Sequence, residues 1–142
     1  MLGRTTAIGL RGVAHLLRSR ISSVGACYYW FSSGLVGWNS SATRFATATN
    51  LAGPWSDLQL LRTDPLSEDS FNAQHEFIIP VARTEATKWV YAGDRYSQWI
   101  KVGTGRNVIL PLVWENDLPA LLWYREWKVE VTTGRSSTIA TP

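Results

Sequence analysis

Acidic residues are absent from the first 56 positions of this 142-residue chain, where the first carboxylate is Asp57. The same stretch carries five arginines, whereas residues 57–142 hold all 11 acidic side chains and nine basic ones. The modest net charge of +3 therefore hides a strong asymmetry along the chain. Residues 1–56 therefore supply no carboxylate side chain for a reaction that needs one.

Cysteine and histidine are also scarce. The single Cys27 excludes an intrachain disulfide and leaves the redox compartment open. His15 and His75 are too few and too far apart in the sequence to form a metal site with Cys27. No phosphate-binding glycine loop, nucleophile elbow or zinc spacing occurs either. We therefore expect neither a metal nor a cofactor.

Long apolar runs and lysine are nearly missing as well. No apolar run approaches the roughly 20 residues that span a bilayer, so we expect no membrane span. The arginines are spread thinly and no nucleic-acid-binding motif is present, so we expect no nucleic-acid partner. With 45% hydrophobic and 18% charged residues, the chain has the composition of one globular domain.

Tryptophan, by contrast, is abundant, with eight residues in the chain. A buried indole N–H needs a hydrogen-bond acceptor, which makes tryptophan a costly core residue. Some of the eight rings are therefore candidates for a stacking surface, although we interpret most of them as packing.

From Cys27 onward, short β-type runs alternate with turn signals. The runs read CYYWFSS, TRFATAT, LQLLRT, HEFIIPVA, TKWVYAGD, RNVILPLVW, ALLWYR and WKVEVTT. Gly53-Pro54 is predicted to fix a reversal, Asn116-Asp117 to form a hairpin tip, and DPLSEDSFNAQ to form a polar loop. Short strands at this spacing predict an all-β fold, either a sandwich, a barrel or a propeller.

Residues 1–27 differ from everything that follows. They are basic and free of acid, and they are mildly amphipathic if helical between about Ala7 and Arg20. Their composition resembles an organellar transit peptide and lacks the apolar core of a secretory signal. The alternative, which we favour slightly, is a segment foreign to the fold. We therefore expect residues 1–27 to be helical or disordered outside the domain, and residues 134–142 to be a frayed tail.

The stretch from Phe71 to Arg95 carries the strongest functional signal. Gln74 stands just ahead of one strand run, and the Gly93-Asp94-Arg95 corner closes the next. An amide and an Asp-Arg pair so placed would line a small polar cleft. The alternative is structural: an amide that caps a strand edge, and an Asp turn whose arginine pairs across the sheets.

Six motifs in order carry a resemblance to a known family: SSGLVGW, ATATNLAGPWS, FNAQHEFIIPV, YAGDRY, RNVILPL and LLWYREWKVE. Over about residues 28–131 they resemble the C-terminal part of glycoside hydrolase family 43, in its galactan 1,3-β-galactosidase-like branch. The family fold is a five-bladed β-propeller with a central active site. At about 40–50 residues per blade, the resemblance implies that residues 28–133 supply only about the last two blades, a partial propeller.

The resemblance implies inverting hydrolysis of β-1,3-galactan or related galactosides, in which a Glu acid protonates the leaving oxygen while a second group activates water. In this branch the second group is an amide, and Gln74 matches its position. Trp38 is implied to stack on a galactosyl ring, or else to pack between blades. Asp94 and Arg95 are implied to bind sugar hydroxyls, with Arg95 alternatively holding a catalytic carboxylate. Tyr96 replaces a family Trp as a smaller ring platform.

Besides Tyr96, the sequence departs from the family pattern at Val36, His75 and Glu76. Val36 replaces a Thr, whose hydroxyl would supply a substrate hydrogen bond worth about 0.5–1.5 kcal/mol. His75 and Glu76 stand where the family usually has small hydroxylated residues. We expect these two side chains either to alter the cavity or to face solvent.

The family's general acid lies in a Glu-Ala-Pro motif shortly before the strand that matches CYYWFSS. Here that stretch reads HLLRSRISSVGA, without a carboxylate. Because leaving-group protonation contributes about 10²–10⁴-fold, we expect a fragment that is inactive alone, such as a truncated gene product. The alternatives are a non-catalytic galactoside-binding domain and a purely structural β domain.

The expected partner is a galactan-type polysaccharide or oligosaccharide. Open blade edges and apolar blade faces also predict self-association. Members of the family are usually secreted, yet this N-terminus is not a recognisable secretory signal, so the sequence leaves the compartment open.

Overall fold

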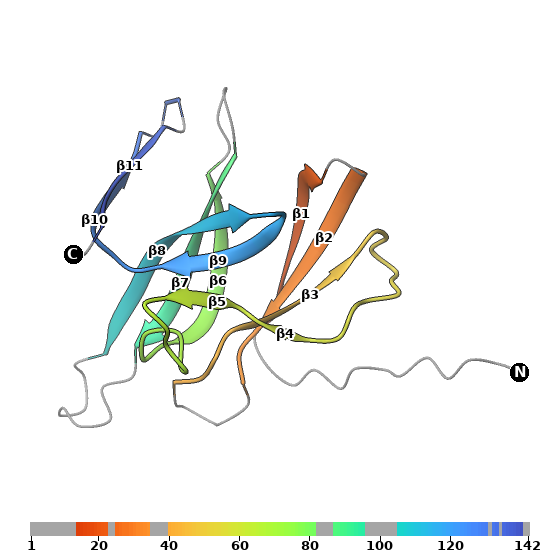
Figure 1. The fold of residues 1–142 in the computed structure, drawn as a ribbon, viewed down its shortest axis with the longest axis horizontal. Coiled ribbons are helices and arrows are strands. Elements are labelled where there is room, and N and C mark those ends of the chain that lie inside the picture. Colours follow the sequence, from red (N-terminus) through yellow and green to blue (C-terminus); the bar gives the residue numbers. More distant parts are fainter. Residues whose placement is uncertain are drawn as a thin grey trace, which may run out of the picture.

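The computed structural model describes residues 14–22, 25–34, 40–81, 87–95, 105–130, 132–133 and 135–140. Every regular element in these ranges is a β-strand (Figure 1), which confirms the all-β prediction. The strands are β1 Ala14–Ser22, β2 Gly25–Ser32, β3 Arg44–Ala48, β4 Gln59–Leu60, β5 Arg62–Asp64, β6 Gln74–Val81, β7 Lys88–Arg95, β8 Arg106–Glu115, β9 Leu118–Leu122, β10 Tyr124–Val129 and β11 Ser136–Ala140. Among the described residues, no helix has the length and apolarity that crossing a membrane requires.

Two sheets make up most of the fold. The first has the strand order β1-β2-β3-β4, with antiparallel neighbours throughout. The second has the order β5-β9-β8-β7-β6 and is antiparallel except for the parallel pair of β5 and β9. Strands β10 and β11 pair separately. Figure 1 shows the five-stranded sheet lying between the first sheet and the β10–β11 pair.

The core lies between the two main sheets. Tyr29 and Phe31 of β2 and Phe45 of β3 pack with Tyr91 of β7 and Leu121 of β9, and all five side chains are buried. Alternate residues of a strand point to the same face, so each sheet presents one apolar face to the other. Burial of these large side chains therefore joins the two sheets into one unit.

The Asn116-Asp117 tip is confirmed as the turn between β8 and β9. Both residues have positive φ, 51° and 63°, the backbone of a type I′ hairpin turn, which Asn and Asp tolerate better than other side chains. The Tyr29 hydroxyl donates to the Asp117 carbonyl oxygen at 2.7 Å. This contact fastens the turn of the second sheet to the first sheet.

Both ends of the described chain differ from the sequence expectation. Residues 14–20 belong to strand β1 and not to a helix, because β1 pairs with the outer edge of β2 from Ala14↔Ser32 to Ser22↔Gly25. An open strand edge carries unpaired backbone groups, and satisfying them overrides a weak helical pattern. The expected frayed tail likewise contains β11, which pairs with β10. The domain division after residue 27 and the number of blades stay predictions.

Candidate functional site

Three polar residues form a row across neighbouring strands of the second sheet. Gln74, the first residue of β6, lies opposite Asp94 of β7, and Asp94 lies opposite Asn107 of β8. Directly opposed residues project from the same face of a sheet, with Cβ atoms about 4.5–5.5 Å apart. The Asn107 side-chain Nδ2 donates to Asp94 Oδ1 at 2.9 Å. Two of the residues singled out from the sequence, Gln74 and Asp94, are therefore brought together.

Gln74 is held against the loop that leaves β2. Its Nε2 donates to the Gly34 carbonyl oxygen at 3.4 Å. Ser41, at the far side of the same loop, accepts from the Gly34 amide at its Oγ, 3.0 Å away, and donates its own amide to the Ala73 oxygen at 3.1 Å. Gly34 and Ser41 thus both lie beside Gln74 and its neighbour Ala73.

Two of the predicted sugar-binding residues, Trp38 and Tyr96, lie outside the described residues. The same holds for Val36, the position where the family has a Thr. The roles given to these side chains stay predictions.

Glu76 lies close to the polar row because the strand bulges there. The register of β6 against β7 shifts between His75 and Phe77, which makes Glu76 the extra residue. Partial burial, and secondly the negative charge of Asp94, raise the pKa of the Glu76 carboxyl above its ordinary value. The site therefore concentrates negative charge at one end of β6 and β7.

His75 points to the opposite face of the sheet from Gln74. Its side chain is fully buried, with ring centroids 6.1 Å from Phe31 and 5.6 Å from Tyr91. His75 therefore does not face solvent, because the alternation of a strand directs it into the core. That it alters the cavity stays a prediction.

Arg95 contacts a loop rather than a carboxylate in the described structure. Its Nε and Nη2 donate to the Phe71 carbonyl oxygen at 3.0 and 2.7 Å. Its guanidinium carbon lies 5.3 Å from the centre of the Trp123 ring, which itself meets the Phe71 ring edge-on at 5.2 Å. Residues 70–72 all have positive φ. Arg95 therefore braces the strained loop that leads into β6, and its role in sugar binding stays a prediction.

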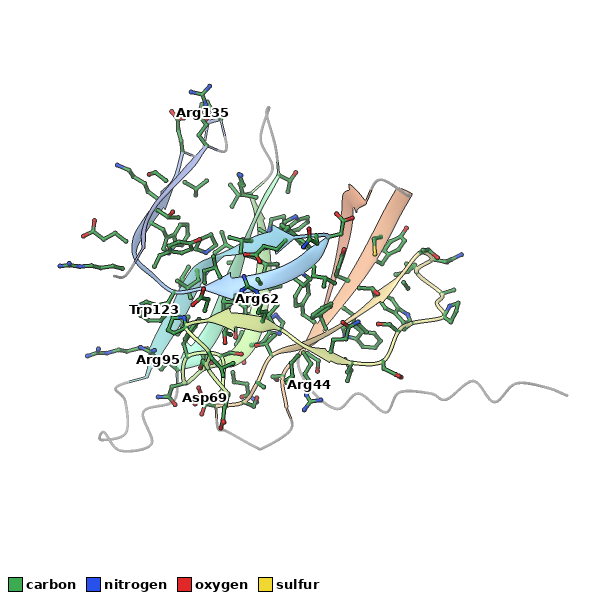
Figure 2. All side chains as sticks on the ribbon, in the orientation of Figure 1. Arg44, Arg62, Asp69, Arg95, Trp123 and Arg135 are labelled. Atoms are coloured by element: carbon green, nitrogen blue, oxygen red, sulfur yellow. The ribbon has the colours of Figure 1, made fainter. Side chains whose placement is uncertain are left out.

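A buried hydroxyl cluster supports the row from the core side. The Tyr91 hydroxyl lies 3.0 Å from Thr43 Oγ1, and Ser70 Oγ donates to the same atom at 3.0 Å. Burial raises the pKa of Tyr91 to about 12, an effect that the hydrogen bonds to Thr43 and Ser70 partly offset. The hydroxyl therefore stays neutral and ties β7 to the strand and loop that flank it. Figure 2 shows Arg95, Trp123 and Asp69 gathered at this end of the molecule.

Gly93 permits the close approach of β6 and β7 at the row. A Cβ atom there would lie 2.9 Å from the Gln74 carbonyl oxygen and 2.9 Å from the Tyr91 ring. Any side chain at this position would therefore push against the backbone of Gln74.

A cavity of about 460 Å³ adjoins the row. Arg95 and Asn107 line it on the β7–β8 side, and Trp123 and Trp127 line it on the β10 side. The arrangement offers hydrogen-bonding groups next to aromatic rings, the combination that an amphipathic ring such as a sugar requires. Among the described residues, no three His, Cys, Asp or Glu side chains are grouped so that they could hold a metal ion.

Sequence reasoning missed Asn107 and the hydroxyl cluster. Asn107 is the second residue of the strand run RNVILPLVW. Pairing that run with TKWVYAGD would place a polar residue near Asp94, but the sequence does not set the register across the connecting segment. Ser70 and Tyr91 follow Thr43 by 27 and 48 positions. No local pattern signals such a contact.

Replacing Glu76 with glutamine is expected to stabilise the fold slightly at neutral pH. Folding raises the pKa of the Glu76 carboxyl, so its protonated form favours the folded state. This contribution to the free energy of unfolding is lost as pH rises from the ordinary pKa of 4.5 through the pKa in the folded protein. Solvent screens this partly exposed group, so the gain of Glu76→Gln near neutral pH stays at or below about 0.5 kcal/mol.

Thermal unfolding at about pH 7 and about pH 3 checks this expectation, since the gain should vanish where both states are protonated. Glu68→Gln, at an exposed loop position, serves as the control and should show no such pH-dependent gain. A loss of stability in Glu76→Gln at neutral pH would contradict the charge repulsion with Asp94.

No family model matches the chain, and no curated protein matches it. Solved structures do. An exo-β-1,3-galactanase from Clostridium thermocellum is 32% identical with a TM-score of 0.68, over 78% of this chain and 24% of that one. The exo-β-1,3-galactanase from Phanerochaete chrysosporium, solved with galactose, is 26% identical with a TM-score of 0.68, over 80% of this chain and 25% of that one.

A variant of the Phanerochaete chrysosporium enzyme, solved with β-1,3-galactotriose, is 27% identical with a TM-score of 0.66, over 79% of this chain and 25% of that one. The chain thus spans about a quarter of the length of these structures. The family resemblance drawn from the six ordered motifs is thus confirmed. The chain belongs to glycoside hydrolase family 43, in its β-1,3-galactanase and galactosidase branch, and corresponds to a C-terminal part of it.

Proposed function

We propose that the chain is the galactoside-holding part of a glycoside hydrolase that acts on β-1,3-galactan or related galactosides, and that it is inactive alone. The observation that carries this proposal is the row of Gln74, Asp94 and Asn107 at adjoining strand ends. The solved relatives hold galactose and β-1,3-galactotriose, which supports the same ligand class here.

Each member of the row has a role that its contacts support. The Nε2 of Gln74 donates to the Gly34 oxygen, which fixes the amide beside Asp94, and we assign to this amide the holding of the attacking water. A neutral amide is a weak base, so Gln74 positions this water rather than removing its proton outright. Asn107 binds one oxygen of the Asp94 carboxylate and leaves the second oxygen for a sugar hydroxyl.

The proton donor of inverting hydrolysis has no counterpart in the part of the site that this chain supplies. The acid and the water-activating group must flank the sugar from opposite sides, with about 6.5–9.5 Å between them. Glu76 is a carboxyl group near the row, but it comes from the same strand as Gln74, and we do not assign it the role of the acid. No carboxylate precedes Asp57. The chain therefore holds the water and sugar side of the reaction without the acid side.

A non-catalytic galactoside-binding domain is the second candidate. Binding through the row needs no acid, and the aromatic cavity next to Asn107 favours retention of a sugar even where hydrolysis is lost. The two candidates share the binding step and differ only in turnover.

Self-association is proposed from the exposed apolar side chains of the strand that ends the second sheet. That strand is β6, and its Phe77 and Ile79 are 51% and 45% exposed. Exposed apolar side chains on an outermost strand favour contact with another chain. Sedimentation equilibrium that reports only monomer at all concentrations would refute this part of the proposal.

Binding of methyl β-galactoside tests the proposed function. Asp94→Asn is expected to weaken binding roughly tenfold, because a hydrogen bond to a charged acceptor is lost. The measurement is an NMR titration that follows the side-chain amide signals of Gln74 and Asn107. Asp57→Asn, on an exposed loop, is the matched control and should bind as the unmodified chain does. If neither amide signal moves with millimolar galactoside, only a structural β domain remains.

A further inference from the structure

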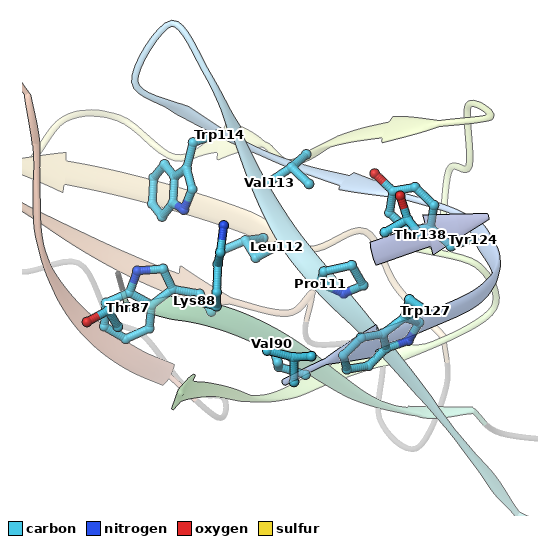
Figure 3. A pocket seen from close by; sticks show the side chains of 12 residues that line it. Thr87, Lys88, Val90, Pro111, Leu112, Val113, Trp114, Tyr124, Trp127 and Thr138 are labelled. Carbon is cyan, nitrogen blue, oxygen red and sulfur yellow. The ribbon is translucent and has the colours of Figure 1, made fainter. Parts of the chain in front are cut away.

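A second cavity lies at the other end of the five-stranded sheet from the polar row (Figure 3). It measures about 390 Å³ and is enclosed by the beginning of β7, the end of β8 and the β10–β11 pair. Val90 lines this pocket, whereas Asp94 of the row lies four residues further along β7, about 13 Å away at the rise of a strand. The pocket therefore does not include the row, although Tyr124 and Trp127 line both this pocket and the cavity beside Asn107.

Two indole rings of the pocket are held in place by contacts outside it. Trp127 donates its Nε1 hydrogen to the Ile109 carbonyl oxygen at 2.8 Å. Trp114 meets the ring of Tyr29 edge-on, with centroids 4.8 Å apart and planes at 69°, and Tyr29 is fixed in turn by its bond to Asp117. These rings are preorganised walls, so a ligand that stacks on them does not have to immobilise them first.

Polar groups occupy the rest of the lining. They are the ammonium of Lys88 and the hydroxyls of Thr87, Tyr124 and Thr138. Within the described part of the chain, the side chains of these four residues make no hydrogen bond and no ion pair. Figure 3 shows the Tyr124 and Thr138 hydroxyls at one end of the pocket and the Lys88 ammonium toward the other, with the Trp127 ring nearby.

The indole rings and polar groups of the lining together indicate which class of ligand the pocket can bind. An apolar ligand would remove the Lys88 ammonium and the hydroxyls from water without replacing their hydrogen bonds, which is unfavourable. A pyranose has C–H faces for the indole rings and hydroxyls for the polar groups at both ends. The volume also lies within the roughly 300–1,000 Å³ of small-molecule sites. We propose that this pocket is a second saccharide-binding site, independent of the Gln74 row, that accommodates a pyranose unit.

An NMR titration with β-1,3-galactotriose tests the pocket in the intact chain. The indole Nε1–H signals of Trp89 and Trp114, which line this pocket but not the cavity beside Asn107, are expected to shift with a common midpoint at concentrations up to about 10 mM. Lys88→Ala should raise that midpoint about 3- to 10-fold, the loss of a single hydrogen bond. Lys128→Ala removes an exposed lysine of β10 that does not line the pocket, and it should leave the midpoint unchanged.

The Gln74→Ala variant separates this inference from the proposed function. If the pocket binds the sugar independently of the row, the two indole signals shift in Gln74→Ala as they do in the unmodified chain. The inference is overturned if the indole signals do not shift, if Lys88→Ala and Lys128→Ala behave alike, or if the shifts disappear in Gln74→Ala. The inference is also overturned if the chain is a dimer and its indole signals do not shift when the sugar is added. A second copy would then cover the pocket.

Discussion

Purified chain is expected to release galactose from β-1,3-galactan at least about 100-fold more slowly than a complete family enzyme such as that of Clostridium thermocellum, because leaving-group protonation contributes about 10²–10⁴-fold. The reason is the composition of the site. In the proposed function, the row of Gln74 and Asp94 positions water and sugar. An amide and a carboxylate on one side of the sugar ring cannot also protonate the leaving oxygen on the other side.

The substrate itself provides the control for this expectation. A nitrophenyl galactoside has a leaving group that departs as a stable anion and gains little from an acid. The deficit relative to the complete enzyme should therefore shrink on the aryl substrate and remain large on galactan. Galactan hydrolysis at a rate comparable with the complete enzyme, and abolished in Gln74→Ala, would show that the chain contains its own acid and would refute the proposed inactivity.

Gly93→Ala is expected to destabilise the fold by about 1–3 kcal/mol, the cost of forcing a methyl group into a packed interior. The added carbon would lie 2.9 Å from the Gln74 carbonyl oxygen and 2.9 Å from the Tyr91 ring. Neither neighbour can yield easily. Gln74 is paired in the β6–β7 ladder, and Tyr91 is fully buried with its hydroxyl bonded to Thr43.

Gly105→Ala is the matched control, because a Cβ at Gly105 would meet no atom within 4 Å. Urea unfolding of both variants, with the midpoint as the readout, separates a steric effect from a general effect of adding a methyl group. Equal midpoints for the two variants would contradict the close approach of β6 and β7. The fraction of Gly93→Ala protein that remains folded should also bind galactoside more weakly, since the clash moves the Gln74 backbone.

The strand pattern of this chain was readable because it rests on local chemistry. The alternation of apolar residues predicts β2, β3 and β6 to β8, and Asn116-Asp117 marks a hairpin because both residues tolerate positive φ. Strand β1 was not predictable in the same way. Its mixed sequence becomes a strand because β2 offers an open edge, and edge pairing is a property of the tertiary structure rather than of the segment.

The site was predictable in part for the same reason. Gln74 and Asp94 stand at the start and end of consecutive strands, and an antiparallel hairpin brings such positions together. The position of Glu76 near Asp94 depends on a one-residue β-bulge, which the composition of the segment does not predict. The bond of Arg95 to the Phe71 carbonyl depends on a loop of positive φ residues. Contacts of that kind follow from the complete fold, so the sequence alone left more than one role open for Arg95.

A crystal structure of the chain with β-1,3-galactotriose would test the central claim most directly, since that claim is that the row of Gln74, Asp94 and Asn107 holds a galactosyl unit. The predicted result is a galactosyl ring whose hydroxyls lie about 2.5–3.2 Å from the Gln74 amide and the free oxygen of the Asp94 carboxylate. A trisaccharide bound only elsewhere on the molecule, with the row exposed to solvent, would contradict it.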